Sequence, residues 1–310
     1  MQGSNDGRRF RIPPSRRLTF DLLWFNRSVP LCGHDRMVSL RELAVARKES
    51  PVRISWPALF LRAFSLVAQQ YPELRQTWYR WPFAHIYQHP VNVASITVHR
   101  EWKEAAWLFW GQIQAPESLT LPEIQQQLNQ FRDGPVRATF KRQTQLAQLP
   151  TLLRRLIWWW NLNVATSRRA KRLGTFFLST LAGRGAEIQV PPAIHTGCLT
   201  FGPLNNEGAS RVTLAYDHRV MDGVLVAEVL KVTQHNLKRL FPFVALGLLF
   251  TVWLMFRRLW PAALSLAVSL IAVCWSMGVA VLVDPKVNVL VAMAPAVILI
   301  VAFSDVVHLC

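Results

Sequence analysis

The chain has 310 residues, of which 51% are hydrophobic and 17% are charged, and its formal net charge is +17. This apolar share excludes an intrinsically disordered chain, because there is ample surface to bury in a core. The cysteines are far apart in the sequence, which argues against a disulfide scaffold and against a cysteine-type zinc site. They are Cys32, Cys198, Cys274 and Cys310.

The N-terminal residues are polar and basic and contain no apolar segment, so they are not typical of a signal peptide. We expect residues 1–9 to be disordered and a domain to begin near Pro13 and Pro14 and to extend over residues 10–238. Without an export signal, we expect this domain to lie in the cytoplasm.

Hydrophobic periodicity and capping signals predict both helices and strands within this domain. Ser55 is a candidate N-cap, and Thr120 with Glu123 has the form of a capping box. Helices packed on a mostly β core predict an α+β or two-layer α/β fold. The predicted helices cover residues 40–48, 55–70, a segment after 120, and 223–237, and the predicted strands cover residues 91–98, 105–113, 175–180, 198–201 and 211–216.

Residues 239–310 have a different composition. Three uncharged stretches, residues 240–256, 261–283 and 289–303, follow one another. A spanning helix needs about 20 apolar residues, so we expect two or three transmembrane helices and a multi-pass protein of the inner (cytoplasmic) membrane. The alternative is a buried hairpin of a soluble protein. Basic residues flank the first stretch on both sides, which leaves its orientation open.

Residues 214–223 contain the pattern H-x-x-x-D-G, formed by His218, Asp222 and Gly223. The predicted strand places His218 at its end, and Asp222 is positioned to cap the helix that follows. A histidine with a pKa near its reference value of about 6.5 serves as a general base at cellular pH. The alternative is a surface turn with an incidental histidine, because short patterns often match by chance.

Residues 214–223 resemble the D-H-R-V-x-D-G signature of the 2-oxoacid dehydrogenase acyltransferase catalytic domain, which chloramphenicol acetyltransferase shares more loosely. Residues 174–181 resemble the G-T-F-x-x-S-N-L strand of that family, and residues 12–18 loosely resemble its P-x-S-R segment. Residues 119–131 resemble the helix that follows its strand pair. The resemblance covers most of residues 10–238 and implies a two-layer, chloramphenicol acetyltransferase-like α/β fold.

The resemblance also implies a mechanism. His218 Nε2 would take the proton from a thiol or hydroxyl as that group attacks an acyl thioester, and Ser179 Oγ would donate to the developing oxyanion. Asp222 would fix the turn and hold a basic partner, Arg16 or Arg17. The implied assembly is a homotrimer in which His218 and Ser179 of one site come from different chains. The alternative for Ser179 is a strand hydroxyl that only satisfies its own hydrogen bonds.

Three departures from the family limit this inference. Thr180 stands where the family has asparagine, residues 181–183 read Leu-Ala-Gly instead of Leu-Gly, and the sequence contains no lipoyl domain and no D-K-A lipoylation motif. We therefore expect no lipoyl group on this chain and expect acyl-CoA or an acyl-carrier protein as the donor. Both are acidic, which suits the net charge of +16 on residues 1–239. A degenerate domain retained for assembly or membrane binding is the alternative.

Residues 152–173 combine six basic residues with three consecutive tryptophans, Trp158 to Trp160. This pattern suits a membrane interface, and the same residues could hold the phosphates of CoA. The third possibility is a helix that covers the core with a solvated basic face. Nucleic-acid binding is disfavoured, because no recognised module is present.

The remaining histidines have no other metal-ligating residues near them in the sequence, and we expect no metal site. They are His34, His85, His89, His99, His195 and His235.

Residues 240–310 resemble consecutive spans of resistance-nodulation-division exporters. A fragment of a membrane exporter is therefore another alternative, although transport by so few spans is not expected. In those exporters the loop matching Arg257 and Arg258 faces the cytoplasm, which conflicts with a cytoplasmic domain at residues 1–239. Asp305 and His308 are ionisable groups within a predicted span and are candidate functional residues on that ground.

Overall fold

The computed structural model describes residues 10–49 and 53–256. The chain divides into two compact units, and the first consists of Met1–Lys48 and Val52–Phe241. The predicted spans over residues 261–283 and 289–303, and the predicted disordered residues 1–9, lie outside the described residues.

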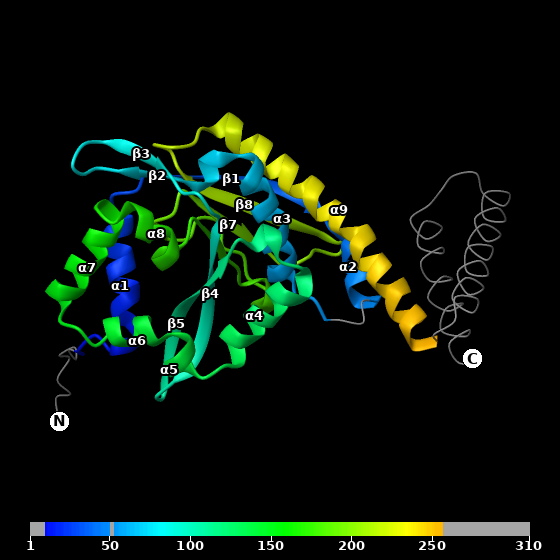
Figure 1. Ribbon diagram of the computed structural model, residues 1–310, viewed down its shortest axis with the longest axis horizontal. Helices are drawn as coiled ribbons and strands as arrows, with labels where there is room; N and C mark the ends of the chain where they lie inside the picture. The colour runs from blue at the N-terminus through cyan, green and yellow to red at the C-terminus, as the bar shows by residue number, and fades with distance from the viewer. Residues whose placement is uncertain (1–9, 50–52, 257–310) are drawn as a thin grey trace, which may run out of the picture. The chain divides into compact units, whose positions relative to one another are not determined.

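The first unit is built on one mixed sheet of six strands in the order β1-β8-β7-β6-β4-β5 (Figure 1). β4, β6 and β7 run parallel to one another, while β5, β8 and β1 pair antiparallel with their neighbours. β2 and β3 form a separate hairpin. The strands are β1 Leu31–Ser39, β2 Gln76–Tyr79, β3 His85–Gln88, β4 Val93–Trp102, β5 Ala105–Gln114, β6 Phe176–Ser179, β7 Gly197–Phe201 and β8 Ala209–Asp217.

Helices connect these strands and cover both faces of the sheet (Figure 1). Three short 3-10 turns join the longer elements at Pro72–Arg75, Pro116–Ser118 and Ala182–Arg184. The α-helices are α1 Pro14–Asn26, α2 Arg41–Glu49, α3 Trp56–Gln70, α4 Leu121–Asp133, α5 Val136–Thr139, α6 Lys141–Leu146, α7 Thr151–Asn163, α8 Thr166–Leu173 and α9 Gly223–Phe256.

The main hydrophobic core lies between one face of the sheet and helices α3, α4 and α9. Alternate strand residues such as Phe176 and Leu178 point into it, as the period of two in a strand requires. α3 is apolar on nearly all sides and is the most deeply buried of these helices. The mixed α/β class predicted from the sequence is confirmed.

The opposite face carries smaller apolar clusters under α1 and α7. Phe177, which neighbours Phe176 on β6, points to this side and packs with Cys198 and Ala215. A further cluster joins Leu22 of α1 to Trp158 of α7 and to Ile194. Side chains from distant parts of the sequence therefore meet over this face, where the candidate site lies.

The capping box at α4 is present as predicted. The backbone N–H of Glu123 donates to Thr120 Oγ1, and the N–H of Thr120 donates to Glu123 Oε2 at 2.7 Å. The backbone N–H and the hydroxyl of Thr120 both donate to the Glu123 carboxylate and hold its pKa below the usual value of 4.5. Because this folded-state pKa is depressed, the carboxylate contributes stability above pH 4.5, and that contribution is lost as the pH falls through the folded-state pKa.

Replacing Thr120 with alanine is expected to destabilise the protein by about 1 kcal/mol, the usual cost of losing an N-cap. Urea unfolding of both proteins at neutral pH measures this difference. Thr151→Ala is the control, because the side chain of Thr151 makes no cap bond at the start of α7. An equal loss in both variants would contradict the capping role of Thr120.

Other predicted helix boundaries differ in detail. Ser55 occupies the N-cap of α3 but makes no side-chain cap bond, and its N–H donates to Gln125 Oε1 at 2.7 Å. α9 continues to Phe256 and thus includes the first predicted span, residues 240–256. Within the described part of the chain, no helix has the length and apolar character needed to cross a membrane. The transmembrane segment is therefore not supported by the structure and stays a prediction.

Candidate active site

The H-x-x-x-D-G turn begins at His218, directly after the last residue of β8. The backbone N–H of His218 donates to the carbonyl of Pro30 at 3.1 Å. The side chain is exposed, and its ring centroid lies 5.6 Å from that of Tyr216. The strand thus presents His218 at its end, as predicted, with an imidazole that solvent or a second molecule can reach.

The residues on either side of His218 hold the turn in place. Asp217 is buried and accepts two bonds from the Arg219 guanidinium, Nε to Oδ1 at 2.8 Å and Nη2 to Oδ2 at 2.6 Å. The backbone N–H of Arg219 adds a third bond to Asp217 Oδ1. A bidentate, charge-assisted pair of this kind is stronger than neutral hydrogen bonds. Arg219 also lies 4.2 Å above the ring of Trp78. The sequence prediction did not assign this role to either residue.

Asp222 begins α9 as expected. Its Oδ1 accepts the N–H of Leu225 at 2.8 Å, which satisfies one of the free N–H groups of the first helical turn. The expected basic partner is not found within residues 10–49 and 53–256, since neither Arg16 nor Arg17 forms an ion pair with Asp222 in the chain. Arg17 instead donates to the carbonyl of Ala147, because α1 packs beside the segment that precedes α7.

His34 and Tyr216 lie beside the turn, and the sequence prediction did not assign them to the site. The His34 ring on β1 stacks on Tyr216 with centroids 5.5 Å apart. A Cβ on Gly223 would approach His34 Cε1 to 3.2 Å, so the glycine of the motif leaves room for this ring. Burial raises the pKa of the Tyr216 hydroxyl, and nearby Cys32 and Asp222 raise it further. His34 thus lies against the motif, although no sequence pattern connects it with His218.

Ser179 is the last residue of β6 and is buried. Its Oγ accepts a hydrogen bond from Thr97 Oγ1 of β4 at 3.3 Å. The Thr180 hydroxyl donates to the carbonyl of Phe201 and accepts the N–H of Ala182, so Thr180 fixes the chain as it leaves the strand. The hydrogen atom of Ser179 Oγ is not needed for the bond to Thr97, which leaves it free to donate to another acceptor.

The sheet register keeps Ser179 and His218 apart within one chain. Ser179 pairs with Thr200, and Thr200 pairs with Thr213 on the next strand. His218 lies five residues further along the chain than Thr213. At about 3.3 Å per residue, His218 is about 16 Å from Thr213 along the chain direction of β8. The two strand spacings between β6 and β8, about 4.8 Å each, add to its distance from Ser179. The two side chains therefore cannot meet around one substrate atom unless they come from different copies of the chain.

A cavity of about 740 Å³ opens on the face of the sheet to which Ser179 points. Phe177 lines the cavity and lies two residues before Ser179, so both side chains are on the same side of β6. Trp110 of β5, which pairs with Thr97 of β4, also lines the cavity. Neither Ser179 nor His218 is among its lining residues. Its volume is in the range of small-molecule sites.

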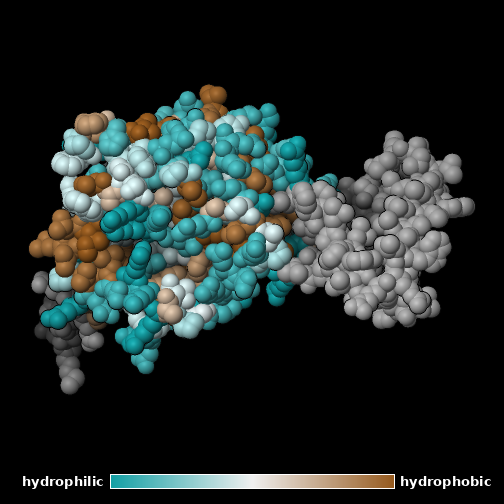
Figure 2. Space-filling model, viewed as in Figure 1, coloured by the Kyte–Doolittle hydropathy of each residue, from teal (hydrophilic) through white to brown (hydrophobic). Residues whose placement is uncertain are grey.

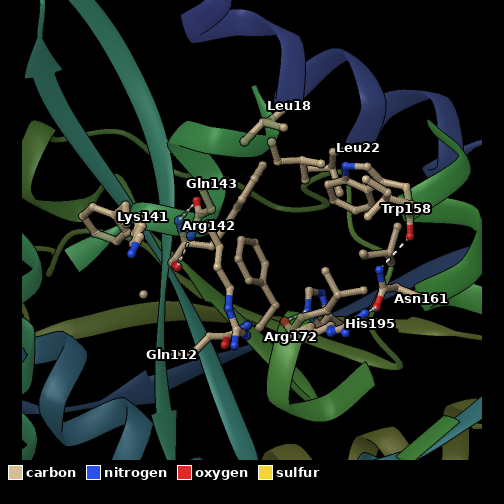
Figure 3. Close-up of a pocket in the computed structure, with 18 of the residues that line it drawn as sticks. Leu18, Leu22, Gln112, Lys141, Arg142, Gln143, Trp158, Asn161, Arg172 and His195 are labelled. Carbon is tan, nitrogen blue, oxygen red and sulfur yellow. Dashed lines mark hydrogen bonds between the residues drawn. The ribbon is translucent and has the colours of Figure 1, made fainter. Parts of the chain in front are cut away.

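The cavity has an apolar side and a polar side (Figure 3). Leu18 and Leu22 of α1 face it from one side, and Arg172 and His195 lie at the other. Burial, together with the nearby Arg169 cation, lowers the pKa of His195 to about 4, so the ring is neutral at pH 7, and its Nε2 donates to the carbonyl of Leu173 at 2.7 Å. The cavity suits a ligand with both apolar and negatively charged parts.

His195 was expected to be an ordinary histidine, and the structure places it in this cavity. Among the residues that the structure describes, no group of three or more His, Cys, Asp or Glu side chains is arranged to hold a metal ion. His85 is the first residue of β3 and His89 directly follows this strand, so neither lies on a helix.

Neither a protein-family model nor a curated protein sequence matches the chain. Solved structures do match it. The truncated catalytic core of a 2-oxoacid dehydrogenase multienzyme complex from Thermoplasma acidophilum aligns with a TM-score of 0.55 and 15% identity, over 75% of this chain and 98% of that one. The cubic core of the pyruvate dehydrogenase multienzyme complex aligns with a TM-score of 0.52 and 15% identity, over 76% and 93%.

A third match is the dihydrolipoamide acetyltransferase of Azotobacter vinelandii, with a TM-score of 0.51 and 16% identity, over 74% of this chain and 92% of that one. That structure concerns the role of a serine, a histidine and an asparagine in its catalytic mechanism. The chain has the fold of these acyltransferase cores. At this level of identity the likeness establishes the fold alone. The resemblance of residues 240–310 to exporter spans gains no support, and most of that segment lies outside the described residues.

Proposed function

We propose that this chain is an acyltransferase that moves an acyl group from a thioester to a thiol or hydroxyl acceptor. The observation that carries the proposal is the turn after β8, where His218 is exposed while Asp217 and Arg219 fix the backbone on both sides of it. A histidine held in this way but open to a second molecule is suited to general base catalysis.

In the proposed reaction, His218 Nε2 takes the proton of the acceptor as its sulfur or oxygen attacks the thioester carbonyl carbon. The tetrahedral intermediate places a negative charge on the former carbonyl oxygen, and Ser179 Oγ donates a hydrogen bond to it. The carbon–sulfur bond of the donor then breaks, and the leaving thiolate takes the proton back from His218. Asp222 acts indirectly by capping α9 at the end of the turn.

We further propose that His218 and Ser179 of one site come from two subunits of a homotrimer. The distance imposed by the register of β6, β7 and β8 supports this arrangement. Two of the matching structures are cores of multienzyme complexes, and one of these is a cubic core. Rotational symmetry repeats the same pair of residues at each interface, so three chains give three equivalent sites.

The proposed donor is acyl-CoA or an acyl-carrier protein, without a lipoyl group on this chain. Lys141, Arg142 and Arg172 line the cavity together with aromatic side chains, which suits the phosphates and the acyl part of such a donor. Membrane anchoring by residues 239–310 also belongs to the proposal, and its support is the series of uncharged stretches in the sequence.

The first test measures CoA, separated from the acceptor by chromatography, after a panel of acyl-CoA compounds is incubated with thiol and hydroxyl acceptors. Free thiol alone is not followed, because transfer to a thiol acceptor leaves its total amount unchanged. Ser179→Ala is expected to lower the rate by about 10²–10³-fold, which is the usual cost of losing one oxyanion donor. Ser210→Ala is the matched control, because Ser210 is also a buried strand serine and donates to the carbonyl of Gly202.

The Ser210→Ala variant is expected to keep its rate within about threefold, because a substitution away from the site affects the stability of the fold more than the rate of the reaction. Equal rates for the Ser179 variant and the unchanged protein would exclude the oxyanion role. Absence of acyl transfer from every acyl-CoA and acyl-carrier donor would favour the degenerate assembly module.

A further inference from the structure

α7 turns its apolar side outward. Leu152, Leu156 and Trp160 follow one another at a spacing of four residues, and their exposed fractions are 85%, 58% and 52%. Such a spacing places side chains on one face of a helix. The buried side of α7 holds the polar residues Arg154 and Asn161 beside Trp158. A helix of a soluble domain normally buries its apolar face, so α7 is inverted.

α1 buries Leu18 and Leu22 but also exposes apolar side chains beside α7. Phe20, Leu23 and Trp24 are exposed and lie on one face of the helix, whereas Asp21 is fully buried. Phe25 stacks on Trp158 of α7, with ring centroids 6.1 Å apart, so the two helices lie side by side. Their exposed side chains form what we call the α1–α7 surface. It consists of Phe20, Leu23, Trp24, Leu152, Leu153, Leu156, Trp159 and Trp160.

Buried charges hold the two helices in this orientation. Arg154 of α7 forms a buried ion pair with Asp21 of α1, and Arg155 lies 3.7 Å from the same carboxylate. These polar groups face inward and bond to each other, so rotating either helix to bury its apolar side would break the pair. The outward apolar face is therefore a fixed part of the fold.

Arginines border the apolar side chains of the surface directly. The guanidinium groups of Arg27 and Arg155 lie 5.4 and 4.0 Å from the centroid of the Trp24 ring. Exposed acidic groups are absent from the surrounding sequence, since residues 134–186 contain no Asp or Glu and Asp21 is the only one between Phe10 and His34. The surface therefore complements a partner that is both apolar and negatively charged.

We propose that the α1–α7 surface docks on the headgroup region of a bilayer containing anionic lipids. Tryptophan and leucine at the boundary of headgroups and acyl chains, with arginine among the phosphates, are the features of an interfacial helix. Figure 2 shows apolar residues gathered at the left of the molecule, over α7. This surface is far larger than the isolated apolar residues usual on a soluble protein.

A two-fold contact, in which a second copy uses this same surface, is disfavoured. Two copies meeting through the same surface would bring Arg27 and Arg155 of both chains together without an acidic partner, and like charges at an interface are unfavourable. Docking of a second copy on the α1–α7 surface would overturn the proposal. The docking of lipid does not depend on the acyl transfer proposed above or on residues 240–310.

The test is hydrogen exchange of the full chain in nanodiscs of phosphatidylcholine, with and without phosphatidylglycerol. Because exchange is read peptide by peptide, it separates the α1–α7 surface from any effect of the hydrophobic C-terminal residues. Peptides from Pro14–Asn26 and Thr151–Asn163 are expected to exchange about tenfold more slowly when phosphatidylglycerol is present, and salt is expected to reverse the effect.

The variant L156E/W160E places carboxylates on the same surface and is expected to remove this protection. Its matched control is F83E/I86E, which changes two equally exposed apolar residues on the β2–β3 hairpin. Protection that is independent of phosphatidylglycerol overturns the proposal. Protection that arises without lipid and grows with protein concentration also overturns it, and assigns the surface to a second copy of the chain.

Discussion

Replacing His218 with alanine is expected to lower thioester-dependent acyl transfer by about 10²–10⁴-fold, the usual contribution of a positioned general base. The substitution removes an exposed ring and leaves the bond from the backbone N–H to Pro30 intact. The Asp217 to Arg219 pair that fixes the turn also remains. We therefore expect the kcat of the variant to fall while its unfolding midpoint stays unchanged.

The matched control is His99→Ala. His99 is also exposed, but it belongs to β4 and lies away from the turn. The rate of this variant is expected to match that of the unchanged protein. Stopped assays that separate and quantify the released CoA at several pH values measure both variants. Full activity of His218→Ala would exclude the catalytic role of this residue, even if the control behaved as expected.

Mixing experiments test whether the site forms between chains. If His218 of one subunit works with Ser179 of another, co-refolded H218A and S179A chains regain some intact sites. Random assembly restores about one quarter of them, because half of the positions supply the histidine and half supply the serine. A site contained within one chain gives no recovery at any mixing ratio.

The regular parts of the fold could be predicted because their signals are local. β4 and β5 follow from β-branched and aromatic residues, and the start of α4 follows from the capping box that Thr120 and Glu123 form. β1 was not predicted, because its residues are mostly polar and exposed and show no alternation. It forms because all nine residues of Leu31–Ser39 pair with β8.

The residues of the candidate site could be predicted, but their arrangement could not. His218, Ser179 and Asp222 each belong to a motif that can be read in the sequence. The distance between His218 and Ser179 depends on the strand order β6-β7-β8, which only the folded chain fixes. The same limit applies to α7, for which the sequence left open a membrane interface, binding of CoA phosphates and a solvated basic face, but not a buried arginine. Arg154 is buried because it pairs with Asp21. This partner lies 133 residues away in the sequence, so no local pattern reveals the pair.

Replacing Asp21 with alanine is expected to destabilise the domain by about 3–5 kcal/mol, the cost of removing one partner of a buried ion pair. The side chain of Asp21 is fully buried and that of Arg154 is 4% exposed, so the remaining guanidinium would be left without its carboxylate. The packing of α1 on α7 depends on this pair. We therefore expect urea unfolding to shift to lower concentrations and both helices to lose protection from hydrogen exchange.

Two further variants separate the buried charge from the loss of a contact. Asp35→Ala removes the carboxylate of an exposed pair with Arg211, and is expected to cost less than about 1 kcal/mol. The double variant D21L/R154M replaces both charges with apolar side chains. It is expected to recover most of the lost stability, because an apolar pair avoids the desolvation of two ions. If D21L/R154M were as unstable as Asp21→Ala, the buried charge of Arg154 would not be the cause. The orientation of α1 and α7 would then depend on the surrounding packing of Leu22, Phe25 and Trp158 instead.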